Sequence, residues 1–318
     1  MPVAACRRGR WLHVASVAGR TVCSALQMTA DNLIAQGQRH EQNREFAAAA
    51  ESYLRAFELA PTDGRLPWEA ARLYLYFVPD AALAVRWFEA ALPLLDNPFM
   101  ARDTRYHLGL AHTFLSDDAR AAVRFEEVLA DTPSHVLACI ELGKLLTRRG
   151  DHARAKDLLQ QAVLHNNMRS TLPEMFPDGQ KGSGHAHALA WMNLGRLALV
   201  AGDDEALGQT AVTHLLEDLD DHARGMTLAN EARAAGKPHS AIVALDGLLA
   251  RYPDHENGGE LWFAIALDDL KRLDEVVEMA TSIAADDPDW AARMVSEVLR
   301  RDSARPAALA FRPAAHPS

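Results

Sequence analysis

Cysteine is scarce in this 318-residue chain, which has only three such residues. Cys6, Cys23 and Cys139 do not form the paired spacings of a metal site or a disulfide framework. Cys139 stands within an apolar helical pattern, where we expect a small core residue. The sequence therefore argues against a fold that depends on cysteine cross-links or on metal held by cysteine.

Long apolar runs and strand patterns are also missing. No apolar stretch approaches the roughly 18 residues that a membrane-spanning helix needs. The alternation of Val, Ile and Thr with polar residues that is typical of strands does not persist, and alanine, leucine, arginine and glutamate dominate instead. We therefore expect an all-α protein that does not insert into a membrane.

Positive charge is in short supply outside the N-terminus. The first 27 residues hold four arginines and no acidic residue, so residues 28–318 carry 29 basic residues and all 43 acidic ones. A surface that binds phosphate groups needs the opposite balance. Nucleic acid is therefore not an expected partner of this main part of the chain.

Residues 1–27 differ from the rest in composition, and two interpretations remain open. A basic start before a mildly apolar stretch would suit an export or targeting segment. An internal His13, the break at Arg20 and the lack of a small-x-small cleavage site argue against export. The favoured interpretation is a disordered extension in front of a cytoplasmic protein that begins at Met28.

A repeated column of small residues is the most informative feature that is present. The glycines of Leu108-Gly109 and Leu142-Gly143 are 34 residues apart, and Leu194-Gly195 repeats the pair. After each of the first two glycines an alanine stands twelve residues on, and a large apolar residue, Phe125 or Leu159, four further. A Ser-Asp or Gly-Asp pair separates the two halves of each unit. A recurring unit of about 34 residues is typical of a helical repeat array.

Each unit has the pattern of two antiparallel helices that pack closely. Apolar residues at three- and four-residue spacing give each half one buried face. Glycine and alanine lack bulk, so the two backbones can approach while the larger residues fill the seam. The Ser-Asp or Gly-Asp pair would end the first helix and cap the second. One such hairpin cannot bury its own apolar face, so neighbouring units must stack.

These columns resemble the tetratricopeptide repeat (TPR), and the resemblance covers most of the chain. It implies an all-α solenoid, or superhelix, of antiparallel helix pairs with about seven TPR-like units, which begin near residues 30, 65, 102, 136, 188, 222 and 257. A terminal helix should cap the last unit with a stripe formed by Trp290, Met294, Val298 and Leu299. The array then occupies residues 28–303, and residues 304–318, rich in proline and alanine, are expected to be a disordered tail.

The spacing between the fourth and fifth units exceeds 34 residues by 18, which marks residues 170–187 as an insertion. Its proline and glycine content, with Pro173, Phe176-Pro177-Asp178-Gly179 and Gly182-Ser183-Gly184, predicts a loop. A long loop in a compact array is often functional, and this one could cover part of a binding groove. The favoured alternative is a surface insertion that the array tolerates.

The resemblance also implies a binding groove on the face formed by the first helix of each pair, where TPR arrays commonly hold a peptide or a partner helix. The residues at these positions give an apolar and aromatic half and a half rich in cations: Leu73, Tyr76, Phe77, Tyr106, Leu110, Phe114, Lys144, Arg148, Met192, Arg196, Asn230 and Arg233. Aromatic residues and arginine usually carry much of the binding energy. We expect a protein or peptide segment that is apolar and then acidic. In the alternative, the aromatic residues pack between repeats and the cations are solvated.

No pattern predicts catalytic, cofactor-binding or metal-binding residues. His185 and His187 have no carboxylate or thiol partner that would complete a metal site. Gly179–Gly184 lacks the preceding strand and the Lys-Ser/Thr pair of a phosphate-binding loop. The leading prediction is a non-enzymatic adaptor for protein–protein interaction. The alternative is a structural subunit that associates with itself or with a larger assembly through the outer faces of the solenoid.

Overall fold

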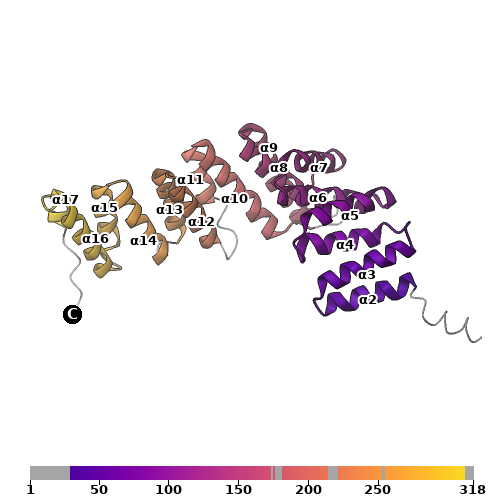
Figure 1. Ribbon diagram of the computed structural model, residues 1–318. Coiled ribbons are helices and arrows are strands. Elements are labelled where there is room, and N and C mark those ends of the chain that lie inside the picture. Colours follow the sequence, from indigo (N-terminus) through magenta and orange to yellow (C-terminus); the bar gives the residue numbers. More distant parts are fainter. Residues whose placement is uncertain (1–28, 173–174, 176–180, 214–220, 253–254, 312–318) are drawn as a thin grey trace, which may run out of the picture. The chain divides into compact units, whose positions relative to one another are not determined.

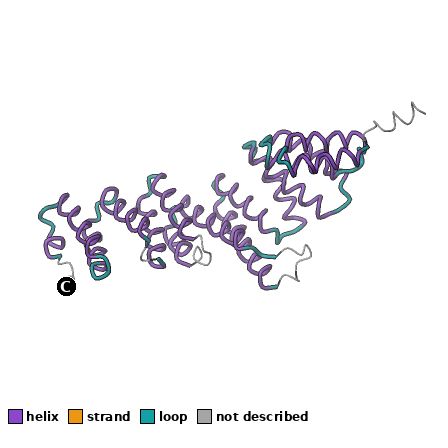
Figure 2. The backbone as a smooth tube through the Cα atoms, turned by 90° about the horizontal axis from the view of Figure 1, so that it is seen from below, coloured by secondary structure: helices purple, strands orange, loops and turns teal. Residues whose placement is uncertain are grey.

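Residues 29–172, 175, 181–213, 221–252 and 255–311 are described by a computed structural model of the chain (Figure 1). Within these ranges the chain forms helices joined by loops and no strand, as Figure 2 shows. The chain divides into two compact units, Met1–Asp131 (unit 1) and Thr132–Ser318 (unit 2). The all-α prediction is confirmed, and each unit is described by itself.

Unit 1 consists of three helix pairs. Its elements are α2 (Ala30–Gln42), α3 (Phe46–Leu59), α4 (Arg65–Tyr76), α5 (Ala81–Ala91), the 3-10 turn η1 (Leu92–Leu94), α6 (Pro98–Phe114) and α7 (Asp118–Asp131). The first and second helix of each pair pack along one another, and α3 and α5 also pack on the first helix of the next pair. Phe88 and Phe125, on second helices, are fully buried in the seams. This is the stack of helical hairpins that the columns predicted.

Unit 2 continues the alternation of first and second helices. Its elements are α8 (Val136–Arg149), α9 (His152–Thr171), α10 (Gly184–Ala201), α11 (Asp204–Thr213), α12 (Asp221–Ala234), α13 (Pro238–Arg251), α14 (Glu256–Ala264), the π-helical turn η3 (Ile265–Asp269), α15 (Leu273–Ile283), α16 (Pro288–Arg301) and α17 (Pro306–Ala310). The most extensive contacts join α8 to α9 and α12 to α13. Leu228, Leu245 and Val298 belong to one continuous buried core.

The breaks between paired helices have the geometry that the Gly-Asp pairs predicted. Gly150 and Gly202 follow α8 and α10 with φ angles of 84° and 74°, in the left-handed region that glycine enters without steric cost. The aspartate that follows caps the next helix. Asp203, for example, accepts a hydrogen bond from the backbone N–H of Ala206 at 2.9 Å.

The column glycines mark places where helices touch. A Cβ added to Gly109 would lie 2.5 Å from Cε1 of Phe125, and one added to Gly143 would lie 2.8 Å from Cγ of Leu159. Both distances are below 3.0 Å, so any side chain there would force the neighbouring helix or its side chain to move. The predicted reason for glycine in this column is confirmed.

The ends of the predicted loop, residues 170–187, belong to the neighbouring helices. Helix α9 runs on to Thr171, and α10 begins at Gly184 because the hydroxyl of Ser183 caps it by accepting the N–H of Ala186 at 3.1 Å. The buried side chain of Asn166 accepts the N–H of Ser183 at 3.0 Å and donates to its carbonyl at 3.1 Å. These two bonds, called the Asn166–Ser183 clamp below, hold the ends of the insertion together.

The prediction for the C-terminal residues was right for the terminal helix and wrong for part of the tail. Helix α16 buries Met294 and Val298, as predicted. Pro306–Ala310, predicted as part of a disordered tail, form α17, which buries Ala308 and packs on α15 and α16. Proline at the first helical position suits such a start. Residues 1–28, which include the predicted extension, and residues 312–318 lie outside the described ranges.

Candidate binding surfaces

Three aromatic side chains predicted for the groove are exposed on unit 1. Tyr76 and Phe77 at the end of α4 are 46% and 48% exposed, and Phe114 at the end of α6 is 66% exposed. Leu110, one turn before Phe114, is partly buried. Exposed aromatic residues of this size are informative, because such area is normally removed from water.

Leu73 and Tyr106, also predicted for the groove, are buried. Leu73 is fully enclosed in the core of unit 1. The ring of Tyr106 lies with its centroid 5.9 Å from that of Phe125, in the seam between α6 and α7. For these two residues the groove prediction was wrong, because their side chains pack between helices.

Tyr76 is held by a cluster of rings around His107 of α6. The Tyr76 hydroxyl lies 2.8 Å from Nδ1 of His107, and Nε2 of His107 lies 3.3 Å from a carboxylate oxygen of Asp103. The His107 ring is stacked on Phe88 at a centroid distance of 5.6 Å. Tyr76 therefore presents its exposed face from a fixed position. We call the surface of Tyr76, Leu110 and Phe114 the first-helix face of unit 1.

Phe77 faces another neighbour. Its ring stacks on Phe46, the first residue of α3, at a centroid distance of 4.3 Å and an interplanar angle of 24°. One side of the ring is therefore used in packing between helix pairs, and we leave Phe77 out of the first-helix face.

In unit 2, the predicted groove residues differ in their burial and in their contacts within the chain. Met192 is buried in the core, so its assignment to the groove was wrong. Lys144 donates to Glu141 on the same helix at 2.7 Å, and the amide of Asn230 donates to the carbonyl of Met226 at 2.8 Å. Arg148 is exposed at the end of α8.

The arginines predicted to meet an acidic group of a partner are paired with carboxylates of this chain. Arg196 makes a two-point contact with Glu231, with N···O distances of 2.9 and 2.6 Å, and Arg233 donates to Asp269 at 2.9 Å. The partners are 35 and 36 residues apart, which is one repeat length. The charge of both arginines is thus already balanced, which argues against a free cationic half on this face.

Other ion pairs join neighbouring repeats at the slightly shorter spacings of 31 or 33 residues, and all these pairs together form a ladder along the chain. Its further members are Arg72–Glu41 in unit 1, and Arg293–Glu260, Arg301–Asp268 and Arg305–Asp274 in unit 2. In the sequence, each of these arginines has its acidic partner 31 to 36 residues away, so a search over that range of distances would have included these pairs.

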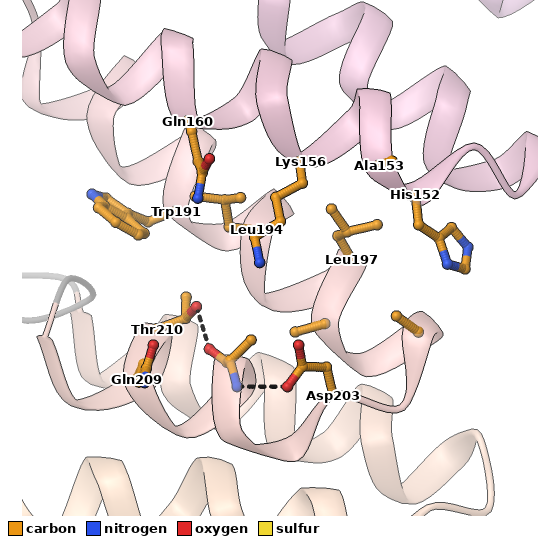
Figure 3. Close-up of a pocket in the computed structure, with 13 residues that line it drawn as sticks. His152, Ala153, Lys156, Gln160, Trp191, Leu194, Leu197, Asp203, Gln209 and Thr210 are labelled. Carbon is orange, nitrogen blue, oxygen red and sulfur yellow. Dashed lines mark hydrogen bonds between the residues drawn. The ribbon is translucent and has the colours of Figure 1, made fainter.

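A cleft of about 490 Å³ opens in unit 2 between α9, α10 and α11 (Figure 3). Its lining includes His152, Lys156 and Gln160 of α9, Trp191, Leu194, Leu197 and Ala201 of α10, Asp203 just before α11, and Ala206, Gln209 and Thr210 of α11. The floor on α10 is apolar and the two walls are polar. A concave apolar site with a few polar groups is the usual form of a ligand site. We call it the α9–α11 cleft.

The cleft coincides with a departure from the repeat columns. The columns that hold alanine and a large apolar residue in other units hold Leu207 and Ala211 here. Leu207 is fully buried, and α11 packs on α10 and α13. Leu228 of α12 takes the place beside Gly195, where an added Cβ would lie 2.8 Å from its Cδ1. The column glycine of α10 therefore lies closer to the next repeat than to its own second helix, where Cγ2 of Thr210 would be 3.5 Å from the added Cβ.

The two walls of the cleft differ in charge. Lys156 and His152 on α9 make no hydrogen bond or ion pair within the described part of the chain. On α11, the carboxylate of Asp203 caps its helix through Ala206, and the hydroxyl of Thr210 donates to the carbonyl of Ala206 at 2.7 Å (Figure 3). The groove prediction missed this site because it considered only the faces of first helices.

The described residues contain no group of three or more His, Cys, Asp and Glu side chains that could hold a metal ion. None of their helices combines the length and apolar character that crossing a bilayer requires.

Comparisons with known proteins connect this architecture to solved structures. No protein-family model and no curated protein matches the chain. A chain of the APC/C hetero-tetramer Cut9–Hcn1 is similar to this chain, with a TM-score of 0.51 and 18% sequence identity. The match covers 74% of this chain and 42% of the Cut9–Hcn1 chain, so this chain spans less than half of the length of that protein. The C-terminal part of a TPR repeat-containing protein from Cytophaga hutchinsonii is similar with a TM-score of 0.50 and 13% identity, over 87% of this chain and 98% of that one. With its stacked hairpins and their column glycines, this chain has the all-α helical-repeat fold of tetratricopeptide repeat proteins.

Proposed function

We propose that this protein is a non-enzymatic adaptor that binds a peptide or partner segment through the first-helix face of unit 1. The observation that supports the proposal is the exposure of Tyr76 and Phe114 on adjacent first helices, with Leu110 beside Phe114. The TPR fold is consistent with this role, because stacked hairpins create an extended surface without a catalytic cluster.

The size of the exposed rings makes them suitable anchors. Burying a Phe or Leu side chain contributes about 1.5–3 kcal/mol, and a few such residues dominate most interfaces. Tyr76 is also held in place by His107, so it loses little conformational freedom on binding. The partner segment would be apolar where it meets this face. An acidic continuation toward Arg196 and Arg233 would have to displace Glu231 and Asp269, so it is not part of the proposal.

The test is capture of partners from an extract of the protein's own cells by the full chain. Phe114→Ala should reduce capture of the specific partner at least tenfold, because it removes an exposed anchor. The fold should persist, since surface substitutions usually change stability by less than about 0.5 kcal/mol. Leu59→Ala is the matched control, because Leu59 is an exposed apolar residue on second helix α3. Equal loss in both variants, or loss in neither, would refute the role of the first-helix face.

Self-association is the second candidate, favoured by exposed apolar residues on second helices. Leu59 of α3, Val123 of α7 and Leu164 of α9 are each more than half exposed. Light scattering at two concentrations separates the two functions. A stable dimer that dissociates in the Leu59→Ala variant would favour a self-associating subunit, and a monomer at both concentrations favours the adaptor.

A further inference from the structure

We propose that the α9–α11 cleft is a second binding site, which takes an amphipathic helical segment of a partner with an apolar residue beside Trp191 and a carboxylate at Lys156. The inference rests on the proposed function only in that the ligand is a protein segment. The cleft is lined by the second helices α9 and α11 and floored by α10, so its residues differ from those of the first-helix face.

The floor sets the length and apolar character of the ligand. Trp191, Leu194, Leu197 and Ala201 follow one another along α10 at three- and four-residue steps. At 1.5 Å per residue this stripe is about 15 Å long, which matches nearly three turns of a partner helix. A helix laid in a groove presents apolar residues at i, i+3 or i+4 and i+7, which is the same repeat as the floor.

The two ends of the cleft differ, which gives the ligand a direction. Figure 3 shows Trp191 and Gln160 toward one end, and His152, Leu197 and Asp203 toward the other. The indole Nε1 of Trp191 donates to Nε2 of His187 at 2.9 Å, so the ring is fixed as part of the wall. A large apolar side chain of the ligand fits beside this ring.

The α9 wall selects an acidic ligand. His152, Lys156 and Gln160 are four residues apart, so they lie on one face of α9, and Lys156 reaches into the cleft (Figure 3). Unlike Arg196 and Arg233, Lys156 has no carboxylate partner within the described part of the chain. Beside an apolar floor an ammonium group loses part of its hydration when a ligand covers it, and an ion pair with a ligand carboxylate compensates for that loss. Asp203 on the opposite side of the cleft accepts the N–H of Ala206 and forms no ion pair with Lys156.

The proposal can be tested with two designed peptides on the full chain. Both are fluorescein-labelled peptides of eleven residues, held helical by a side-chain staple on the outer face, with leucines at i, i+3 and i+7. One carries two glutamates one turn apart along one edge, and its twin carries glutamines there. Fluorescence anisotropy should show that the glutamate peptide binds about five- to tenfold more tightly than its twin. Lys156→Gln should abolish this preference, and added salt should reduce it.

Two further variants locate the binding. Arg154→Gln removes the same charge from α9 at a position two residues from Lys156, which points in another direction on the helix, so the preference for glutamate should remain. Ala206 lines the cleft, so Ala206→Trp should block both peptides. Circular dichroism confirms that each variant is folded.

Several results would overturn the proposal. These are absence of binding by both peptides, equal binding of the two, and a preference that survives Lys156→Gln. Loss of binding in Phe114→Ala with retention in Ala206→Trp would place the peptides on the first-helix face and equally refute the cleft. The capture experiment with Phe114→Ala is read independently, so failure of the adaptor proposal and failure of the cleft are distinguishable.

Discussion

Replacing Gly109 by alanine tests the close approach of helices on which the fold depends. The added Cβ would lie 2.5 Å from Cε1 and 2.8 Å from Cδ1 of Phe125, whose ring is fully buried. Overpacking of this kind costs about 1–3 kcal/mol, and alanine in a helix regains about 1 kcal/mol relative to glycine. We therefore expect the free energy of unfolding to fall by up to about 2 kcal/mol.

The assay is urea unfolding of the full chain, followed by circular dichroism. Gly259→Ala is the control, because Gly259 is helical and an added Cβ would meet nothing within 4 Å. It should raise the free energy of unfolding by about 0.4–1 kcal/mol. Phe125→Ala removes the ring atoms that clash, so the double variant with Gly109→Ala should show a favourable coupling of about 1 kcal/mol. If Gly109→Ala stabilises the protein as Gly259→Ala does, the reasoning is refuted.

Three further outcomes follow from buried and paired groups. Burial lowers the pKa of His112, whose ring nitrogens have no hydrogen-bond partner among the described residues. The free energy of unfolding should therefore fall as the pH drops from about 6.5, the pKa of the unfolded chain, through the lower pKa of the folded state. His112→Leu should remove this part of the pH dependence of the urea midpoint; an unchanged profile would contradict the assignment. A double-mutant cycle on Arg196 and Glu231 should give a coupling of about 0.2–1 kcal/mol that shrinks with salt, and a larger, salt-independent value would contradict a surface pair. Burial raises the pKa of Cys139 to about 12, so in a variant without the two N-terminal cysteines a thiol reagent at pH 8 should label it only on unfolding; rapid labelling of the folded chain would refute this.

The column glycines Gly109 and Gly143 made their helix pairs predictable, because their contacts with Phe125 and Leu159 are local to one hairpin. The exposure of first-helix residues was harder to predict. Leu73 and Leu110 occupy the same column, yet Leu73 is fully buried and Leu110 only partly, since burial depends on how the neighbouring repeat packs. Tyr106 and Met192 also share a column, and both are buried, so that column belongs to the core.

The α9–α11 cleft could not be predicted from any one unit. It arises where α11 packs on α13 and Leu228 of α12 takes the place beside Gly195, which are relations between successive repeats. The leucine at position 207, where other units have alanine, is visible in the sequence. The position that α11 takes as a result is set by tertiary packing.

The Asn166–Ser183 clamp has a consequence for what the chain can carry between α9 and α10. Because the clamp joins Asn166 of α9 to Ser183 before α10, the chain between these two residues closes a ring. The entropy of closing such a ring grows slowly, by about 0.6 kcal/mol for each doubling of its length. The segment is therefore a place where sequence can be lengthened or exchanged at little cost to the array, which makes it a natural site for acquiring a new module or for placing a reporter.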